Sequence, residues 1–391
     1  MKSLQSSSSS LQWRIFTGII TAGLLLYSLS YYLPLPPRGL FLAGIVLPGL
    51  LWLIWSPKAL GGFLQAYIWV LLPLALIQIL NMESWQEWKL WFYFVGFLAC
   101  CTLLDRTKKL EAILTVFAWA SLTVLAWSAM DWWLIHQSTG EWVRYGVLFG
   151  RAVDPIDTAL VISTGLLYLW LYKVEPRLRS VSKWHVMAGF LVLSSLILLI
   201  STVYQARTLL VAYALFLLVY LFARRFWLLG STVILAVVLL SYLMGADQLL
   251  LQRGLSYRPE IWSDALNRVS HVCGIWIGCG KDGYRFLHMY THTHNFLLQI
   301  LYEDGVLGLF IFTILAAYLI KHGRHSNALL WATLGVGGQL TNTGWLLTPP
   351  KAIWVYFWLP VTMLTVEISR EKLHGYWIAR RGLPDEERTA A

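Results

Sequence analysis

Two histidines and two acidic residues lie close together in one stretch, THTHNFLLQILYEDGVLG, which runs from residue 291 to residue 308. His292 and His294 stand directly before an apolar run, and Glu303 and Asp304 interrupt that run. An imidazole, whose ordinary pKa is about 6.5, can take a proton from a hydroxyl group at neutral pH. His294, at the start of the apolar run, is therefore a candidate general base.

Two arginines stand where a phosphate could bind. Arg207 lies in a short turn between two apolar runs, where an arginine either extends to lipid headgroups or faces the protein interior and binds a phosphate. Arg258 precedes Pro259, which favours a helix start and its positive end, although a solvated loop arginine is the alternative. Separated arginines beside one imidazole could hold a diphosphate leaving group while the histidine activates an attacking hydroxyl.

Weaker candidates accompany this set. Arg151 and Arg285 could belong to the same anion site. The DPID sequence at Asp154 and Asp157 could bind a divalent ion or cap a helix, and we favour the cap. Since guanidinium groups can take the place of a metal ion beside a diphosphate, we expect neither a metal nor another cofactor.

Glu303 and Asp304 raise a separate question. If the run after His294 is one helix, these carboxyl groups lie roughly 14–15 Å along it, at about 1.5 Å per residue. They are then too far away to be direct partners of the imidazole. An ionisable group within a bilayer is normally paired, so we expect an arginine such as Arg207 or a water-lined cavity beside them.

The elements that must position these residues are membrane helices. The 391-residue chain is 58% hydrophobic and 13% charged, with a mean hydropathy of +0.62, whereas a soluble domain carries about 25% charge. Apolar runs of helix length recur along the chain, which indicates an all-α polytopic membrane protein, because a β-barrel would show short alternating strands. The twelve predicted spans are 14–33, 39–56, 64–81, 89–104, 111–130, 155–172, 185–202, 207–223, 226–244, 294–320, 327–345 and 352–369.

Twelve spans put both termini on one side of the membrane. That side holds 19 of the 30 Lys and Arg residues and the other side holds 11, so we expect both termini in the cytoplasm. Eight of the 11 outer cations fall in only three segments, 131–154, 202–207 and 245–293, where we expect an anion site. No basic arm or aromatic–basic motif indicates nucleic acid. We expect one transmembrane domain over residues 1–391, which includes the long outer loop.

The outer loop at 245–293 is expected to contain an amphipathic helix at the membrane surface, with Trp262 and Leu266 on its apolar face. Cys273 and Cys279 lie six residues apart in the same loop. In an oxidising compartment they could form a disulfide, or they could remain separate. A zinc site is less favoured, because two cysteines would need further ligands.

The residues around His294 resemble a known signature. HNFLLQILYEDGVLG places Asn295, Gly305 and Gly308 at the spacing of the O-antigen ligase signature of bacterial lipopolysaccharide assembly. That signature is a histidine, then Asn, Ser or Gln, then nine residues, a glycine, two residues, and Gly, Thr or Tyr. RPEIWSDALN followed by GCGKDGY resembles the wider O-antigen ligase and polymerase superfamily, and Arg207 resembles the second essential arginine of that superfamily.

The resemblance implies a GT-C-like glycosyltransferase of the bacterial inner membrane with a periplasmic active site. It implies transfer of a glycan from undecaprenyl diphosphate to a sugar hydroxyl of lipid A–core, without a metal ion and with inversion of the anomeric carbon. By position it implies that His294 is the base and that Arg207 and Arg258 bind the diphosphate. The further residues assigned to substrate binding are Arg151, Arg285, His292, Asn295 and Tyr257.

Two other functions remain open at this point. An O-antigen polymerase of the same superfamily would use the same donor and another lipid-linked glycan as acceptor, although the nine-residue spacing favours the ligase. A flippase or transporter of lipid-linked sugars would place charged groups through the membrane midplane and often shows repeated halves. The sequence displays neither feature.

Overall fold

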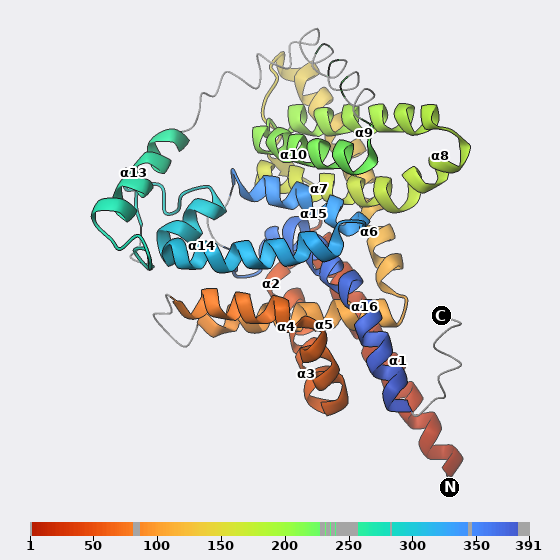
Figure 1. Ribbon diagram of the computed structural model, residues 1–391. Coiled ribbons are helices and arrows are strands. Elements are labelled where there is room, and N and C mark those ends of the chain that lie inside the picture. The colour runs from red at the N-terminus through yellow and green to blue at the C-terminus, as the bar shows by residue number, and fades with distance from the viewer. Residues whose placement is uncertain are drawn as a thin grey trace.

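The chain folds almost entirely into helices (Figure 1). This computed structural model describes residues 2–80, 87–226, 257–281, 284–342 and 346–381, together with residues 231, 235 and 239. Within those residues, the only strands are the two-residue β1 (Val147–Leu148) and β2 (Arg151–Ala152), which form an antiparallel hairpin.

The helical elements follow one another with short connections. They are α1 (Lys2–Leu29), α2 (Pro37–Phe41), the π-helical turn η1 (Leu42–Val46), α3 (Leu47–Trp55), α4 (Pro57–Leu80), α5 (Trp88–Arg106), α6 (Leu110–Thr139), α7 (Pro155–Leu169), the π-helical turn η3 (Trp170–Val174), α8 (Glu175–Val181), α9 (Lys183–Val203), α10 (Arg207–Arg224), α13 (Arg258–His271), α14 (Phe296–Gly323), α15 (Asn327–Gln339), the π-helical turn η4 (Trp354–Trp358) and α16 (Leu359–Arg381).

Eight helical segments in the described part of the chain are long and apolar enough to cross a membrane. Each coincides with one of the predicted spans, so the protein is an all-α protein built for repeated membrane crossing, as the sequence predicts. These segments are Pro37–Trp55, Pro57–Leu80, Trp88–Arg106, Leu110–Thr139, Pro155–Val181, Lys183–Val203, Arg207–Arg224 and Phe296–Gly323.

The other four predicted spans have different outcomes. The first corresponds to the apolar part of α1 and the last to η4 with α16. The prediction at 327–345 is wrong in length, because α15 has 13 residues and ends at Gln339. At about 1.5 Å per residue it measures roughly 20 Å, short of the roughly 30 Å hydrocarbon core. The predicted span at 226–244 lies outside the continuously described residues.

The amphipathic helix predicted in the outer loop exists as α13, but its buried face differs from the prediction. Ile261, Ala265 and Val269 are buried, whereas Leu266 is 49% exposed. The buried residues recur every four positions and therefore form one stripe along the helix. The reason for the difference is that α13 packs against α14, and the contact with that helix selects the buried face.

Aromatic side chains fill the centre of the bundle and hold an irregular segment in place. Trp354 and Trp358 are fully buried. The indole N–H of Trp354 donates to the carbonyl oxygen of Thr348 at 3.1 Å. That of Trp358 donates to the carbonyl oxygen of Leu346 at 3.0 Å. Because a buried indole needs a partner for its N–H, these bonds fix the segment 346–348 against the bundle.

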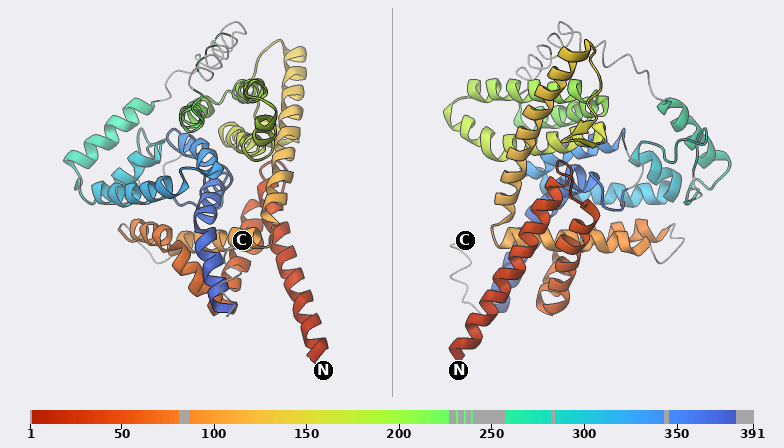
Figure 2. Two further views of the ribbon diagram at one scale, coloured as in Figure 1. Left: turned by 45° about the vertical axis from the view of Figure 1, so that its right-hand side comes forward. Right: turned by 180° about the vertical axis from the view of Figure 1, so that it is seen from behind.

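The helices give the bundle two chemically distinct ends. Beside the start of α10, the backbone N–H of Tyr145 in the predicted outer segment donates to the carbonyl oxygen of Val203 at the end of α9. At the other end of α10, Arg224 pairs with the buried Glu175 at 3.1 Å, and Arg179 pairs with the same carboxyl group at 2.5 Å. These cations, which are predicted to be cytoplasmic, are thus engaged at the end of α10 opposite Arg207. Figure 2 shows α13, in teal, at the edge of the bundle in both views.

Candidate functional site

Arg207 and Arg258 are the first residues of α10 and α13. The first amide N–H groups of a helix lack partners within the helix and carry partial positive charge. Neither helix has a side-chain N-cap, whereas Asn295 caps α14 and Asp154 caps α7. Two helix starts that each combine such N–H groups with a guanidinium group favour an anion.

Arg258 lies within electrostatic range of Arg207 and of His294. Burial lowers the pKa of Arg258, and the positive charge of Arg207 lowers it further. Burial also lowers the pKa of His294; a hydrogen bond to the backbone of Asn342 opposes this shift, and the charge of Arg258 adds to it. Because such electrostatic effects weaken with distance, they link Arg258 to Arg207 on one side and to His294 on the other, and we call the surroundings of these three residues the cationic region.

The hydrogen bonds of the two histidines give them different roles. Nδ1 of His294 lies 3.3 Å from the backbone oxygen of Asn342. A carbonyl oxygen only accepts, so Nδ1 carries the proton in this bond and Nε2 keeps its lone pair. The N–H of His294 donates to Nδ1 of His292 at 3.2 Å. Burial, followed by the charges of His294 and Lys351, lowers the pKa of His292 to about 4. His292 is thus a neutral acceptor for the backbone.

Hydrogen bonds from two helices hold the peptide next to His294. Trp262 of α13 donates its Nε1–H to the carbonyl oxygen of Thr293 at 2.9 Å. Gln299 of α14 accepts from the N–H of Thr293 through Oε1, also at 2.9 Å. The threonine is fully buried, and its hydroxyl donates to the carbonyl oxygen of Asn295 at 2.8 Å. Thr293 therefore anchors His294 between α13 and α14.

Three residues at the site have a left-handed backbone conformation. The φ angle is 45° at Gln205, 57° at Tyr257 and 54° at His294. Gln205 stands two residues before Arg207, and Tyr257 stands directly before Arg258. Such conformations cost about 1–3 kcal/mol each in residues other than glycine, and they persist only where the surrounding structure fixes them. The backbone is therefore tightly determined where the cations converge.

A loop closed by a disulfide packs against the interruption in α14. The helix is interrupted at Gly305, where φ is 65° and ψ is −164°. Cys273 and Cys279 are joined by a disulfide, and the N–H of Cys279 donates to the carbonyl oxygen of Tyr302 at 2.6 Å. A Cβ atom at Gly305 would lie 2.4 Å from the backbone of Trp276 in this loop. Only glycine accommodates both the φ angle and the approach of the loop.

The break lies directly after the two carboxyl groups. α14 is helical from Phe296 up to Gly305, so Glu303 and Asp304 are separated from His294 by helix, as expected, and the interruption follows them. They line a cavity together with residues of α4, α5 and the outer loop. Of the two partners expected for them, the structure therefore has the cavity, and Arg207 is not among its lining residues.

Loss of the disulfide should loosen this loop. Replacing Cys273 and Cys279 together by serine should lower the free energy of unfolding by roughly 2 kcal/mol, because a closed loop of this size restricts the unfolded chain. Thermal unfolding in detergent measures the effect, and wild-type protein treated with a reductant should show the same decrease. The double variant is the control, since reductant should not change it further. If the reductant leaves the unfolding temperature of the wild-type protein unchanged, the prediction is contradicted.

Tyr257 stands beside Arg258 in a row of aromatic side chains. It directly precedes Arg258 and is 53% exposed. Its ring centroid is 6.2 Å from that of Tyr290, which is 5.8 Å from the ring of His294. The two tyrosines thus form an aromatic path from the solvent-exposed side of the site to the imidazole.

The contacts described for the other three predicted ligands, Arg151, Arg285 and Asn295, do not place them beside Arg207 and Arg258. Arg151 is exposed and donates to the carbonyl oxygens of Ser30 at 3.5 Å and Leu33 at 3.4 Å, beyond the end of α1. Arg285 is exposed in the loop before α14. The side chain of Asn295 accepts from the N–H of Leu298 as the cap of α14, which explains this asparagine by helix structure.

Asn342 is a site residue that the sequence analysis missed. Its backbone oxygen accepts from His294, and its side chain donates to Asp157 at 3.0 Å. Asp154 caps α7, as predicted, by accepting from the N–H groups of Ile156 and Asp157 at 2.8 and 3.1 Å. Asn342 carries no pattern that marks it, because it stands in an irregular segment. Among the described residues, no three His, Cys, Asp or Glu side chains gather in a way that could hold a metal ion.

The chain resembles part of one curated protein. Over 172 residues it is 30% identical to an O-antigen ligase of Pseudomonas aeruginosa. The matched stretch is 40% of this chain and 39% of the relative, so the match spans about two fifths of that protein's length. No protein-family model matches the sequence. This helical membrane protein is thus similar over part of its length to an O-antigen ligase.

Proposed function

We propose that this chain is a GT-C-like membrane glycosyltransferase of the O-antigen ligase type, with twelve spans and both termini in the cytoplasm. It transfers a glycan from undecaprenyl diphosphate to a sugar hydroxyl of lipid A–core at the periplasmic face of the bacterial inner membrane. The proposal is supported by Arg207 and Arg258, which stand at helix starts, and by the electrostatic influence of Arg207 on Arg258 and of Arg258 on His294. The partial similarity to an O-antigen ligase supports it.

The arginines bind the donor diphosphate in this proposal. A guanidinium group presents paired N–H donors that match phosphate oxygens, and its charge persists at every relevant pH. The starts of α10 and α13 add their amide N–H groups and partial positive charge. The same groups stabilise the negative charge that develops on the diphosphate as it departs. Positive charge is thus available without a metal ion.

His294 activates the acceptor. Its Nε2 takes the proton of the acceptor hydroxyl, while Asn342 fixes the tautomer through Nδ1. The hydroxyl oxygen bonds to the anomeric carbon, and the bond from that carbon to the diphosphate oxygen breaks. The electron pair of the broken bond leaves with undecaprenyl diphosphate. A single displacement from the opposite face inverts the anomeric carbon.

Reconstitution tests the proposal directly. Purified protein should join a glycan from its undecaprenyl-diphosphate carrier to lipid A–core and release undecaprenyl diphosphate, and a chelator should not reduce the rate. Absence of product with active substrates, verified with a known ligase, would refute the proposal. In the bacterium, deletion of the gene should remove the whole O-antigen ladder from the core. Core bearing a single repeat unit would instead indicate the polymerase.

The pH dependence follows from the environment of His294. Burial and the charge of Arg258 hold its pKa below the ordinary value of about 6.5, against the raising effect of the bond to Asn342. The unprotonated base therefore persists into mild acid, and the acidic limb of kcat/KM should lie below pH ~6.5. In the Arg258→Ala protein the limb should move to higher pH, because a charge that disfavours protonation is gone. Arg38→Ala, an exposed control, should not move it.

A further inference from the structure

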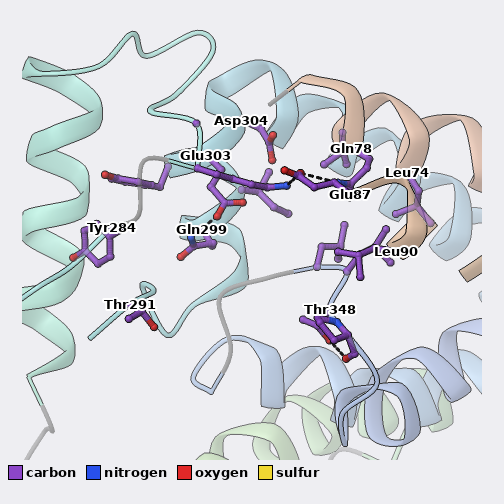
Figure 3. A pocket seen from close by; sticks show the side chains of 18 residues that line it. Leu74, Gln78, Glu87, Leu90, Tyr284, Thr291, Gln299, Glu303, Asp304 and Thr348 are labelled. Atoms are coloured by element: carbon purple, nitrogen blue, oxygen red, sulfur yellow. Dashed lines mark hydrogen bonds and ion pairs between the residues drawn. The ribbon is translucent and has the colours of Figure 1, made fainter. Parts of the chain in front are cut away.

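The cavity beside the break in α14 has a volume of about 420 Å³. Figure 3 shows Gln299, Glu303 and Asp304 of α14 directed towards the same space as Glu87. α4 and α5 contribute the apolar Leu74 and Leu90, and Gln78 and Glu87 lie on the same side as Leu74. Hydrogen-bonding groups from both sides thus form the polar wall of the cavity, and apolar side chains cover the rest of the α4 and α5 side.

The polar wall suits hydroxyl groups better than phosphate. It holds three carboxyl groups, those of Glu87, Glu303 and Asp304, and Lys281 is its one lysine among the described lining residues. The lysine is paired with Glu87. Carboxylates repel a phosphate but accept strong hydrogen bonds from hydroxyl groups. The lining therefore fits a hydroxyl-rich saccharide without phosphate.

The cavity and Arg207 lie on different groups of helices, whereas α13, which begins with Arg258, packs against α14. α10, which begins with Arg207, packs against α7, α9 and α15, whereas the cavity is built on α4, α5 and α14. The segment that carries His294 connects the two regions. Gln299 lines the cavity, and its Oε1 accepts from the N–H of Thr293, the residue before the base. The segment around His294 thus adjoins Arg258 and, through Thr291 and Gln299, a cavity of opposite character.

We propose that this cavity binds the saccharide of the acceptor through its hydroxyl groups and presents one of them to Nε2 of His294. The inference rests on the proposed transfer reaction and adds its acceptor subsite. The donor diphosphate occupies the cationic region, and the carboxyl groups of the cavity keep phosphate out of the acceptor position. A sugar unit that carries phosphate should therefore bind there more weakly than the same unit without phosphate.

Three substitutions test the assignment by steady-state kinetics. Glu303→Gln and Asp304→Asn keep the shape of the side chain and remove its charge, and Leu90→Trp narrows the cavity without changing its charge. Each should raise the KM for lipid A–core about tenfold, since each weakens the contact with the saccharide, and should leave the KM for the donor unchanged. Glu141→Gln, an exposed carboxyl group of the predicted outer face, is the matched control and should change neither.

One further readout separates binding from structural damage. Glu303 accepts from Nε2 of Gln299 at 2.8 Å, so its substitution could displace the segment that holds the base. A displaced base would move the acidic limb of kcat/KM, whereas a lost acceptor contact would not. Asp304→Asn and Leu90→Trp give independent tests. An acceptor KM that stays unchanged in all three variants, or a donor KM that rises instead, would overturn the assignment.

Direct binding distinguishes failure of this inference from failure of the proposed function. Free core oligosaccharide without lipid can be tested against the full-length His294→Ala protein by saturation-transfer NMR. Saccharide binding that Glu303→Gln weakens would support the cavity even if no transfer is found. If the wild-type protein transfers glycan but neither Glu303→Gln nor Leu90→Trp changes saccharide binding, the proposed reaction is retained and the cavity is not the acceptor site.

Discussion

Replacing His294 by alanine should reduce the rate of glycan transfer by about 10²- to 10⁴-fold, the usual contribution of a positioned general base. Binding of the lipid diphosphate should remain, because the guanidinium groups of Arg207 and Arg258 are still present. Initial rates with both substrates measure the first effect. Displacement of a fluorescent undecaprenyl diphosphate measures the second.

Two other histidines serve as controls for this result. His322 is exposed near the far end of α14, and His322→Ala should leave the rate unchanged. His292→Ala should have a smaller effect than loss of the base, because His292 supports the backbone N–H of His294. Full activity of the His294→Ala protein would remove this residue from the mechanism. If the His294→Ala protein is fully active and the His292→Ala protein is inactive, His292 is the general base instead.

Arg207→Ala and Arg258→Ala should each lower kcat/KM for the lipid-linked donor by about 10- to 100-fold. A hydrogen bond to a charged group contributes about 1.5–3 kcal/mol, and each substitution also removes positive charge that stabilises the departing diphosphate. The KM for the donor should rise and kcat should fall. Because the two side chains share one ligand, the double variant should lose less than the product of the single effects.

Lysine at either position gives a graded test. Arg207→Lys and Arg258→Lys keep the charge but lose the planar pair of donors, so their activities should fall between those of the wild type and of the alanine variants. Arg38→Ala provides an exposed arginine control. Donor affinity that is the same in the wild type and in both alanine variants would be incompatible with a diphosphate site here.

Much of the architecture follows from hydropathy alone. Long apolar runs predict helices because a backbone in lipid must satisfy its hydrogen bonds internally, and eight of the predicted spans coincide with apolar helices of sufficient length. The helix start at Arg258 was predictable from Pro259, and the cap of α7 from Asp154. These features depend on residues that are neighbours in the chain.

Features that depend on tertiary contact were not predictable. In the sequence, Gly305 resembles a glycine that allows close packing of a continuous helix. The interruption there is explained by the approach of the disulfide loop, which only the structure shows. Leu266 fits an apolar stripe, yet contact with α14 buries Ile261 and its stripe instead. Asn342 stands 48 residues from His294, and no periodic pattern links such a pair. The candidate base and its cations thus stay predictions from the sequence, whereas the contacts that orient His294 came only from the structure.

The meeting of two like charges has a consequence for the protein without its substrate. Arg207 and Arg258 oppose each other electrostatically, so folding holds them together against their mutual repulsion. A polyanionic ligand relieves that repulsion while it gains its own contacts. In the proposed reaction, binding of the donor diphosphate is therefore thermodynamically linked to the packing of α13 against its neighbours, and the bound donor should strengthen that packing.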